Sequence, residues 1–140
     1  MSLSHHSLVA WQRADDLFIK LHRLSLKAFP SQERYELGQQ LRRAAFSVAV
    51  NIVEGFARPA GRGRVNFLNI SLSSLAEVGY CVHAALRLGY LSAQTAAELE
   101  LEIRQVGAPL VGLIRAERAK ALSGAAGVVV LIAYLTVSLR

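Results

Sequence analysis

Residues 37–55 read LGQQLRRAAFSVAVNIVEG, and the periodicity of this stretch decides the fold class. Its apolar residues recur at steps of three and four, and turning each position through about 100° sorts them into two faces of a helix. One face suits a bundle core, and the second predicts another partner. The first face holds Leu37, Leu41, Ala44, Ala45, Val48 and Ile52, the second holds Phe46, Ala49, Val50 and Val53 beside Arg42, and a polar stripe holds Gln40, Arg43, Ser47, Asn51 and Glu54.

The same helical periodicity extends along the chain on both sides of this stretch. Helices are expected at residues 9–28, 32–55, 64–88 and 93–120. Each carries an apolar stripe of the kind that packs into a bundle, and the connections between them are short, which favours antiparallel neighbours. The sequence therefore predicts an all-α, antiparallel up-down-up-down four-helix bundle formed as one domain by residues 1–120, followed by an apolar tail at residues 121–140.

Prolines and serines mark the expected ends of these helices. Pro30 disfavours a helical conformation at the residue before it and is expected to end the first helix. Ser31 and Ser92 are good N-caps for the helices that follow them. Pro109 lies inside the fourth helix, where it is expected to kink the helix or to interrupt its hydrogen bonds locally.

The apolar tail contains nineteen consecutive residues without a charge, at positions 121–139. At about 1.5 Å per residue, a helix of this length just spans a hydrocarbon layer of roughly 30 Å. Arg115, Arg118 and Lys120 precede it and would hold the bundle on the cytosolic side of a membrane. The alternative is an apolar segment that packs into the assembly. Because the N-terminal residues lack the pattern of a signal peptide, the bundle is expected to be cytoplasmic.

Positive charge is concentrated in one part of the chain. Of the formal net charge of +6, residues 34–64 carry +4, because they contain six arginines and two glutamates. Arg58, Arg62 and Arg64 lie in or beside a glycine-containing loop, where guanidinium groups suit phosphate binding. They are the candidate residues for binding RNA or DNA, mainly through backbone contacts with weak sequence preference. The alternative is a solvated basic face.

The polar stripe is expected to be structural. Glu77 is the only formally charged residue between positions 65 and 86, which predicts a third helix buried on more than one side. An unpaired buried charge is costly, so Glu54 and Glu77 are expected to pair with Arg42 or Arg43, or across a subunit boundary. The residues that complete this structural network or an oligomer interface are Phe46, Asn51 and Val53.

The sequence contains no motif for catalysis or for a metal site. It lacks the Glu-x-x-His pairs with which helical bundles hold metal ions, a phosphate-binding Gly-x-x-x-x-Gly-Lys loop and a nucleophilic serine elbow. Cys81 is expected to be a small buried hydrophobe. His5, His6 and His22 are expected to be solvated. We therefore predict a protein that is not an enzyme and uses no metal or cofactor.

A set of residues spread over most of the chain matches one family pattern. These residues are Trp11, Phe29-Pro30, Glu33, Leu37, Gln40, Arg42-Arg43-Ala44, Ser47, Asn51-Ile52-Val53-Glu54-Gly55, Phe67-Leu68 and Ser74-Leu75-Ala76-Glu77. On these residues, the chain from Val9 to about Arg118 resembles the bacterial four-helix-bundle proteins encoded within intervening sequences of 23S ribosomal RNA genes. The resemblance implies a ring-like homopentamer with no established catalytic activity. More distantly, the chain looks like the accessory proteins of diversity-generating retroelements, which bind nucleic acid and a reverse transcriptase through a basic surface.

Two features depart from the family pattern. Gly79 stands where the family commonly has a second acidic residue after Glu77, and the apolar tail has no counterpart in the pattern. Three functions therefore remain open at the level of sequence. They are a homo-oligomeric scaffold that binds RNA or DNA, an assembly module whose ligand is another protein, and a bundle anchored to a membrane by its tail.

Overall fold

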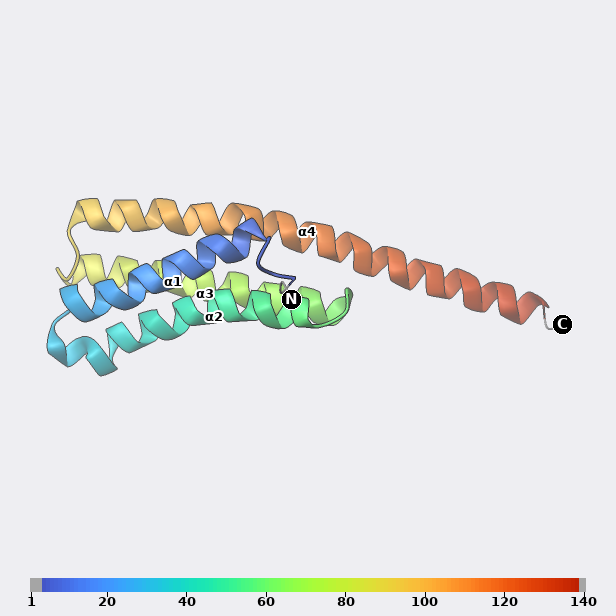
Figure 1. The fold of residues 1–140 in the computed structure, drawn as a ribbon, viewed down its shortest axis with the longest axis horizontal. Coiled ribbons are helices and arrows are strands. Elements are labelled where there is room, and N and C mark those ends of the chain that lie inside the picture. The colour runs from blue at the N-terminus through green and yellow to red at the C-terminus, as the bar shows by residue number, and fades with distance from the viewer. Residues whose placement is uncertain (1–3, 139–140) are drawn as a thin grey trace.

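The computed structural model describes residues 4–138, and these form helices joined by short connections (Figure 1). The elements are α1 (Val9–Ala28), the short 3₁₀ helix η1 (Ser31–Tyr35), α2 (Leu37–Ala57), α3 (Arg62–Arg87) and α4 (Ala93–Ser138). Within the described part of the chain there is no strand. The predicted all-α class is confirmed.

The four α-helices form an antiparallel up-down-up-down bundle, as predicted. Each helix packs against the next one in the chain, and α1 also packs against α4, which closes the bundle. In Figure 1 the turn between α2 and α3 lies at the end of the bundle from which α4 projects. This arrangement brings the arginine-containing turn close to the start of the apolar tail.

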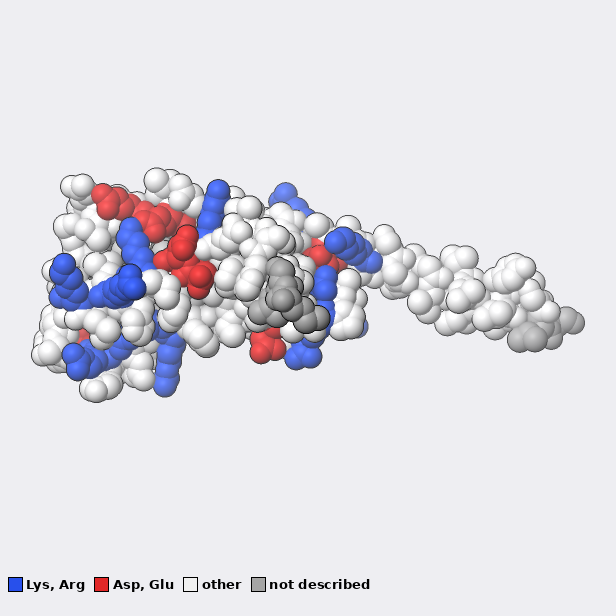
Figure 2. Space-filling view, viewed as in Figure 1, with Lys and Arg blue, Asp and Glu red and all other residues white. Residues whose placement is uncertain are grey.

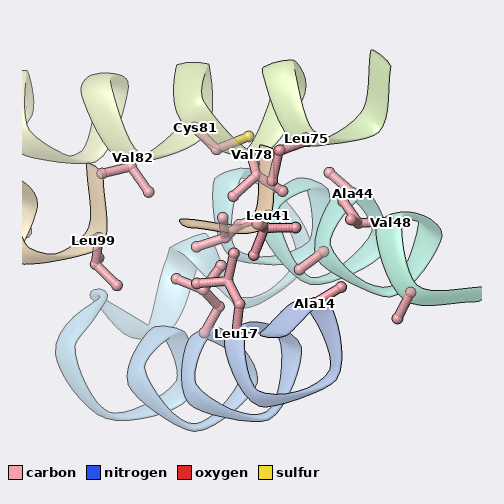
Figure 3. Close-up of a cluster of buried hydrophobic side chains, with 14 of the residues drawn as sticks. Ala14, Leu17, Leu41, Ala44, Val48, Leu75, Val78, Cys81, Val82 and Leu99 are labelled. Carbon is pink, nitrogen blue, oxygen red and sulfur yellow. The ribbon is translucent and has the colours of Figure 1, made fainter. Parts of the chain in front are cut away.

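The core lies along the axis of the bundle, where side chains from all four helices meet (Figure 3). Leu17, Leu41, Val82 and Leu99 are at most 2% exposed and represent α1, α2, α3 and α4 in turn. Each fully buried leucine contributes about 1.5–3 kcal/mol relative to an exposed one. Cys81 is buried among them, which confirms its expected place as a small hydrophobe. Burial, and then the charge of Glu77, raise the pKa of this thiol.

The second helix begins later than predicted. Residues 31–35 form η1 instead, and Ser31 makes no capping hydrogen bond. The carboxylate of Glu33 explains the difference, because its Oε2 accepts a hydrogen bond of 3.0 Å from the backbone N–H of Leu37. Its Oε1 accepts a second bond of 2.8 Å from the hydroxyl of Tyr90, which raises the pKa of that tyrosine. Gly38 permits this tight entry, since a Cβ there would lie 2.7 Å from the carbonyl oxygen of Glu33.

The fourth helix is longer than predicted. It starts as expected, because the Oγ of Ser92 accepts a hydrogen bond of 3.1 Å from the backbone N–H of Thr95. It then runs for 46 residues without interruption, and Pro109 lies inside it. The expected end at Lys120 is therefore wrong. At Pro109 the helix continues, but one helix hydrogen bond is missing there because proline has no N–H, and the carbonyl oxygen of Gln105 accepts a bond of 2.8 Å from Nη1 of Arg13 instead. What changes near residue 120 is burial, because no residue from 121 to 138 is buried.

Candidate functional site

Arg64 stabilises the turn between α2 and α3 through hydrogen bonds to backbone carbonyl groups. Its Nε donates to the carbonyl oxygen of Gly55 at 3.2 Å and its Nη2 to that of Arg58 at 2.7 Å. The guanidinium also lies 4.4 Å from the ring centroid of Phe56 and is 3.3 Å from the carboxylate of Glu117 on α4. Only 15% of its side chain is exposed. Arg64 therefore does not lie open beside Arg58 and Arg62 as the sequence led us to expect.

Glu117 is the acidic partner that the sequence did not reveal. It lies on α4, and only 2% of it is exposed. Its Oε2 faces Arg64, and its Oε1 accepts a hydrogen bond of 3.2 Å from Nζ of Lys120. A buried carboxylate is tolerated when opposite charges and hydrogen-bond donors surround it. This pair joins the α2–α3 turn to α4 just before α4 leaves the bundle.

Arg58 and Arg62 are exposed near this turn. The guanidinium of Arg58 lies 4.5 Å from the ring centroid of Phe67. Arg62 begins α3 and lies beside a groove between α3 and α4 of about 590 Å³. The groove is lined by Arg62, Val65, Asn66 and Asn69 of α3 and by Arg118, Ala121, Leu122 and Ala125 of α4. Figure 2 shows lysine and arginine side chains at this end of the bundle, next to an extension without charge.

The extension of α4 exposes apolar side chains on all sides. Val130 and Tyr134 are each 69% exposed and Val137 is 76% exposed. Eighteen consecutive residues of α4 have a mean hydropathy of 2.0, and none of them is buried in the fold. A contiguous apolar surface is unusual on a soluble monomer and is typical of a site of contact with a membrane or another chain.

The intramolecular ion pairs predicted for the polar stripe of α2 do not form. Arg43, Glu54 and Glu77 are exposed, and no ion pair joins them within residues 4–138. Arg42 instead donates to the Oγ of Ser25 at 3.0 Å and to a backbone carbonyl at 2.6 Å. The prediction failed because it assumed that α3 buries the face that carries Glu77. Pairing across a subunit boundary stays a prediction.

Hydroxyl groups join α2 to α3 where charged pairs were expected. The Nδ2 of Asn51 donates to the backbone oxygen of Ser47 at 2.8 Å and to its Oγ at 2.9 Å. The Ser47 hydroxyl in turn lies 2.7 Å from that of Ser74 on α3. Nearby, the buried Ser71 hydroxyl donates to the carbonyl oxygen of Val48 at 2.6 Å. Asn51 thus belongs to a structural network, as predicted, although the network has no ions.

Phe46 and Val53 remain candidates for an oligomer interface. Phe46 is 54% exposed, and its ring meets that of Phe18 on α1 edge to face at 5.7 Å between centroids. Val53 is half-buried. The contact with Phe18 means that α1 already covers part of the second apolar face of α2.

The N-terminal histidines are not all solvated. His5 is 6% exposed and lies with its ring centroid 4.8 Å from that of Trp11, so the expectation of a solvated His5 is wrong. Burial, and then the neighbouring His6, lower the pKa of His5. His6 and His22 are exposed, as expected. Among residues 4–138, no group of three or more histidine, cysteine, aspartate or glutamate side chains is arranged to hold a metal ion.

The fold and these contacts define an antiparallel helical-bundle protein whose principal polar clusters hold its own helices together. The chain belongs to the family of 23S rRNA-intervening sequence proteins, whose family model matches residues 6–112. The resemblance to proteins encoded within intervening sequences of 23S ribosomal RNA genes is thereby confirmed, and the more distant likeness to accessory proteins of retroelements stays a prediction. Residues beyond 112, including the apolar extension of α4, lie outside this match.

Comparison with solved structures supports the same fold. The chain is similar to the crystal structure of a protein with unknown function from the S23 ribosomal protein family of Bacteroides thetaiotaomicron. The two share 19% sequence identity with a TM-score of 0.71, over 76% of this chain and 96% of the other. At this identity the likeness describes the fold alone. No curated protein matches the chain.

Proposed function

We propose that this chain is a non-enzymatic assembly protein that the extension of α4 anchors in a membrane, with the bundle on the cytoplasmic side. The observation that carries the proposal is the apolar helix segment that no part of the fold covers. Residues 121–138 would extend about 27 Å at 1.5 Å per residue, close to the roughly 30 Å of a hydrocarbon layer. Water-exposed apolar area of this kind costs about 25 cal/mol for each Å², so burial in lipid is strongly favoured.

The charges next to the extension support the proposed orientation. Arg115, Arg118 and Lys120 lie in the two turns of α4 that precede it. Basic residues that flank a membrane helix remain mostly on the cytoplasmic side. The bundle, which precedes the extension in the chain, is therefore expected in the cytoplasm.

Anchoring is tested by fractionating cells that produce the full chain. The protein should sediment with membranes, resist washing at high salt and at alkaline pH, and enter solution with detergent. Val130→Arg together with Leu131→Arg should move it to the soluble fraction, because each arginine near the middle of a membrane helix costs about 2.5–3.5 kcal/mol. Leu101→Arg, at an exposed apolar position on the bundle, is the matched control and should remain in the membrane. A parent protein that stays in solution without detergent would refute anchoring.

Self-association forms the second part of the proposal. The family resemblance implies a homopentamer, and the exposed apolar side chains Phe46, Ile70 and Tyr80 on α2 and α3 support contact between copies. Sedimentation or light scattering of the detergent-solubilised chain measures the number of subunits. A monomer at micromolar concentration would contradict this part without affecting the anchoring.

Nucleic-acid binding is a second candidate function, favoured by the exposure of Arg58 and Arg62 at one end of the bundle. Repetition around a ring would make this end multivalent, so that weak phosphate contacts become measurable. The affinity for RNA and DNA should fall steeply with salt and depend little on sequence. Replacing both arginines by alanine should flatten the dependence on salt. Absence of binding at low salt would remove this candidate.

A further inference from the structure

The groove between α3 and α4 has no role in the bundle itself. It lies where the extension of α4 begins, with Arg62 on one wall and Arg118 on the other. We propose that this groove binds one anionic phospholipid, with its phosphate between the two arginines and an acyl chain along Ala121, Leu122 and Ala125. The inference rests on the proposed membrane anchor and names the ligand that this end of the bundle selects.

If the extension spans a membrane, the groove lies at the boundary between headgroups and acyl chains. If residues 121–138 fill the hydrocarbon layer, Ala121 lies at its edge. Arg118 is three residues earlier on the same helix and therefore lies about 4.5 Å farther from the hydrocarbon layer, at the level of the lipid phosphates. The polar wall of the groove therefore lies among headgroups, while Leu122 and Ala125 lie among the first methylenes.

The charges that line the groove favour an anion. Arg62 and Arg118 are exposed, and neither makes an ion pair with another residue in the range 4–138. No acidic side chain lines the groove, and the amides of Asn66 and Asn69 add hydrogen-bond donors. Guanidinium groups bind phosphate oxygens in pairs, with shorter and stronger hydrogen bonds than neutral donors make. Arg64 and Lys120 differ, because both already contact the carboxylate of Glu117.

The apolar end of the groove has room for a hydrocarbon chain. Ala121 and Ala125 are one turn apart and therefore share a face of α4. Their small side chains line the apolar end of the groove, which lies next to the exposed apolar surface of the extension. A pair of arginines next to apolar side chains suits a phospholipid better than a free phosphate or a nucleic-acid strand.

The test uses the full chain purified in a neutral detergent. Equal amounts of phosphatidylglycerol and phosphatidylcholine with identical acyl chains are added, and native mass spectrometry measures the lipid retained. The parent should retain phosphatidylglycerol preferentially, and millimolar inorganic phosphate should not displace it. Arg62→Ala with Arg118→Ala should lower that preference roughly tenfold or more, as expected for the loss of charge-assisted hydrogen bonds.

Matched variants separate this site from general positive charge. Arg58→Ala with Arg115→Ala removes the same charge at exposed positions outside the groove and should keep the preference. Ala125→Phe, which fills the apolar end, should weaken retention of the lipid while leaving the arginines in place.

Three outcomes would overturn the inference. The first is equal retention of the two lipids by the parent. The second is an equal loss of lipid preference in the Arg62/Arg118 and the Arg58/Arg115 double variants, and the third is displacement of the lipid by inorganic phosphate. Preferential capture of single-stranded RNA through Arg62 and Arg118 would also overturn it and would assign the groove to nucleic acid. Failure of the anchoring is detected separately, as release of the parent from membranes by the alkaline wash. A chain that resists the wash but shows no lipid preference refutes the lipid site alone.

Discussion

Glu117→Gln is the most informative single substitution, because it removes one charge and preserves the shape of the side chain. Removing one partner of a fully buried ion pair costs about 3–5 kcal/mol. Here Arg64 is 15% exposed and would keep its hydrogen bonds to the carbonyl oxygens of Gly55 and Arg58. We therefore expect a smaller loss of about 1–3 kcal/mol, typical of a hydrogen bond to a charged group.

Thermal unfolding followed by circular dichroism at 222 nm, in the same detergent for all variants, measures this loss. Each kcal/mol corresponds to roughly 4 °C in Tm for a domain of this size. Glu100→Gln is the control, because Glu100 is 50% exposed and pairs at 3.5 Å with Arg104, itself 76% exposed. An exposed pair contributes about 0–1 kcal/mol. If the two glutamine variants melted at the same temperature, the claim that Glu117 holds the turn to α4 would be refuted.

A double-mutant cycle sharpens the same prediction. Arg64→Ala alone should destabilise the protein through Glu117 and through the two carbonyl groups that lose their donor. Adding Glu117→Gln to Arg64→Ala should then cost less than Glu117→Gln costs in the parent. A coupling energy of about 1 kcal/mol or more is expected for groups in direct contact, and additive effects would contradict the contact.

Three further predictions concern the bundle, each measured on the full chain in detergent. Gly38→Ala should destabilise it by about 1–3 kcal/mol, because the new Cβ would lie 2.7 Å from a backbone oxygen, whereas Gly112→Ala, with nothing within 4 Å, should stabilise the helix by about 1 kcal/mol. Glu77→Gln and Arg43→Ala should lower the Tm of the assembly, because both side chains are exposed in the single chain and are predicted to pair across a subunit boundary, and an unchanged Tm would refute this pairing. Phe46→Asp should dissociate the assembly while the helical signal is kept, and a joint loss of both would place this residue in the core instead.

The helices themselves were predictable because their signals are local. The apolar stripe of α1 and the proline after it lie within one short stretch, and the predicted bounds of 9–28 are the observed ones. The start of α2 was missed because it depends on Glu33, whose carboxylate also binds Tyr90, 57 residues away. The buried Glu117 was missed for the same reason, since its partner Arg64 is 53 residues away in the chain.

The pairing of the polar stripe of α2 could not be predicted, for a different reason. Sequence periodicity places side chains on the correct face of each helix but does not determine which face a neighbouring helix covers. Glu77 was assigned to the interior because α3 has so few charges, yet α3 turns Ser71 and Ser74 toward α2 and Glu77 toward solvent. For the same reason, the sequence did not predict which of the three loop arginines would be exposed. Arg58, Arg62 and Arg64 lie in or beside one turn, and within residues 4–138 only Arg64 of these three forms an ion pair with an acidic side chain.

The continuity of α4 links the bundle to whatever covers its apolar extension. Glu117 is its last buried residue, only four positions before Ala121, and no flexible linker separates them. The height and rotation of the arginine-containing end are thus fixed relative to the extension. If the extensions of several copies packed together in water, that end of every copy would be brought together, and like charges would approach within the Debye length of about 8 Å. An anionic bilayer surface instead contributes about 1 kcal/mol of attraction for each nearby basic residue. The proposed membrane anchor would therefore gain this attraction in addition to burying the extension, which a soluble assembly would not.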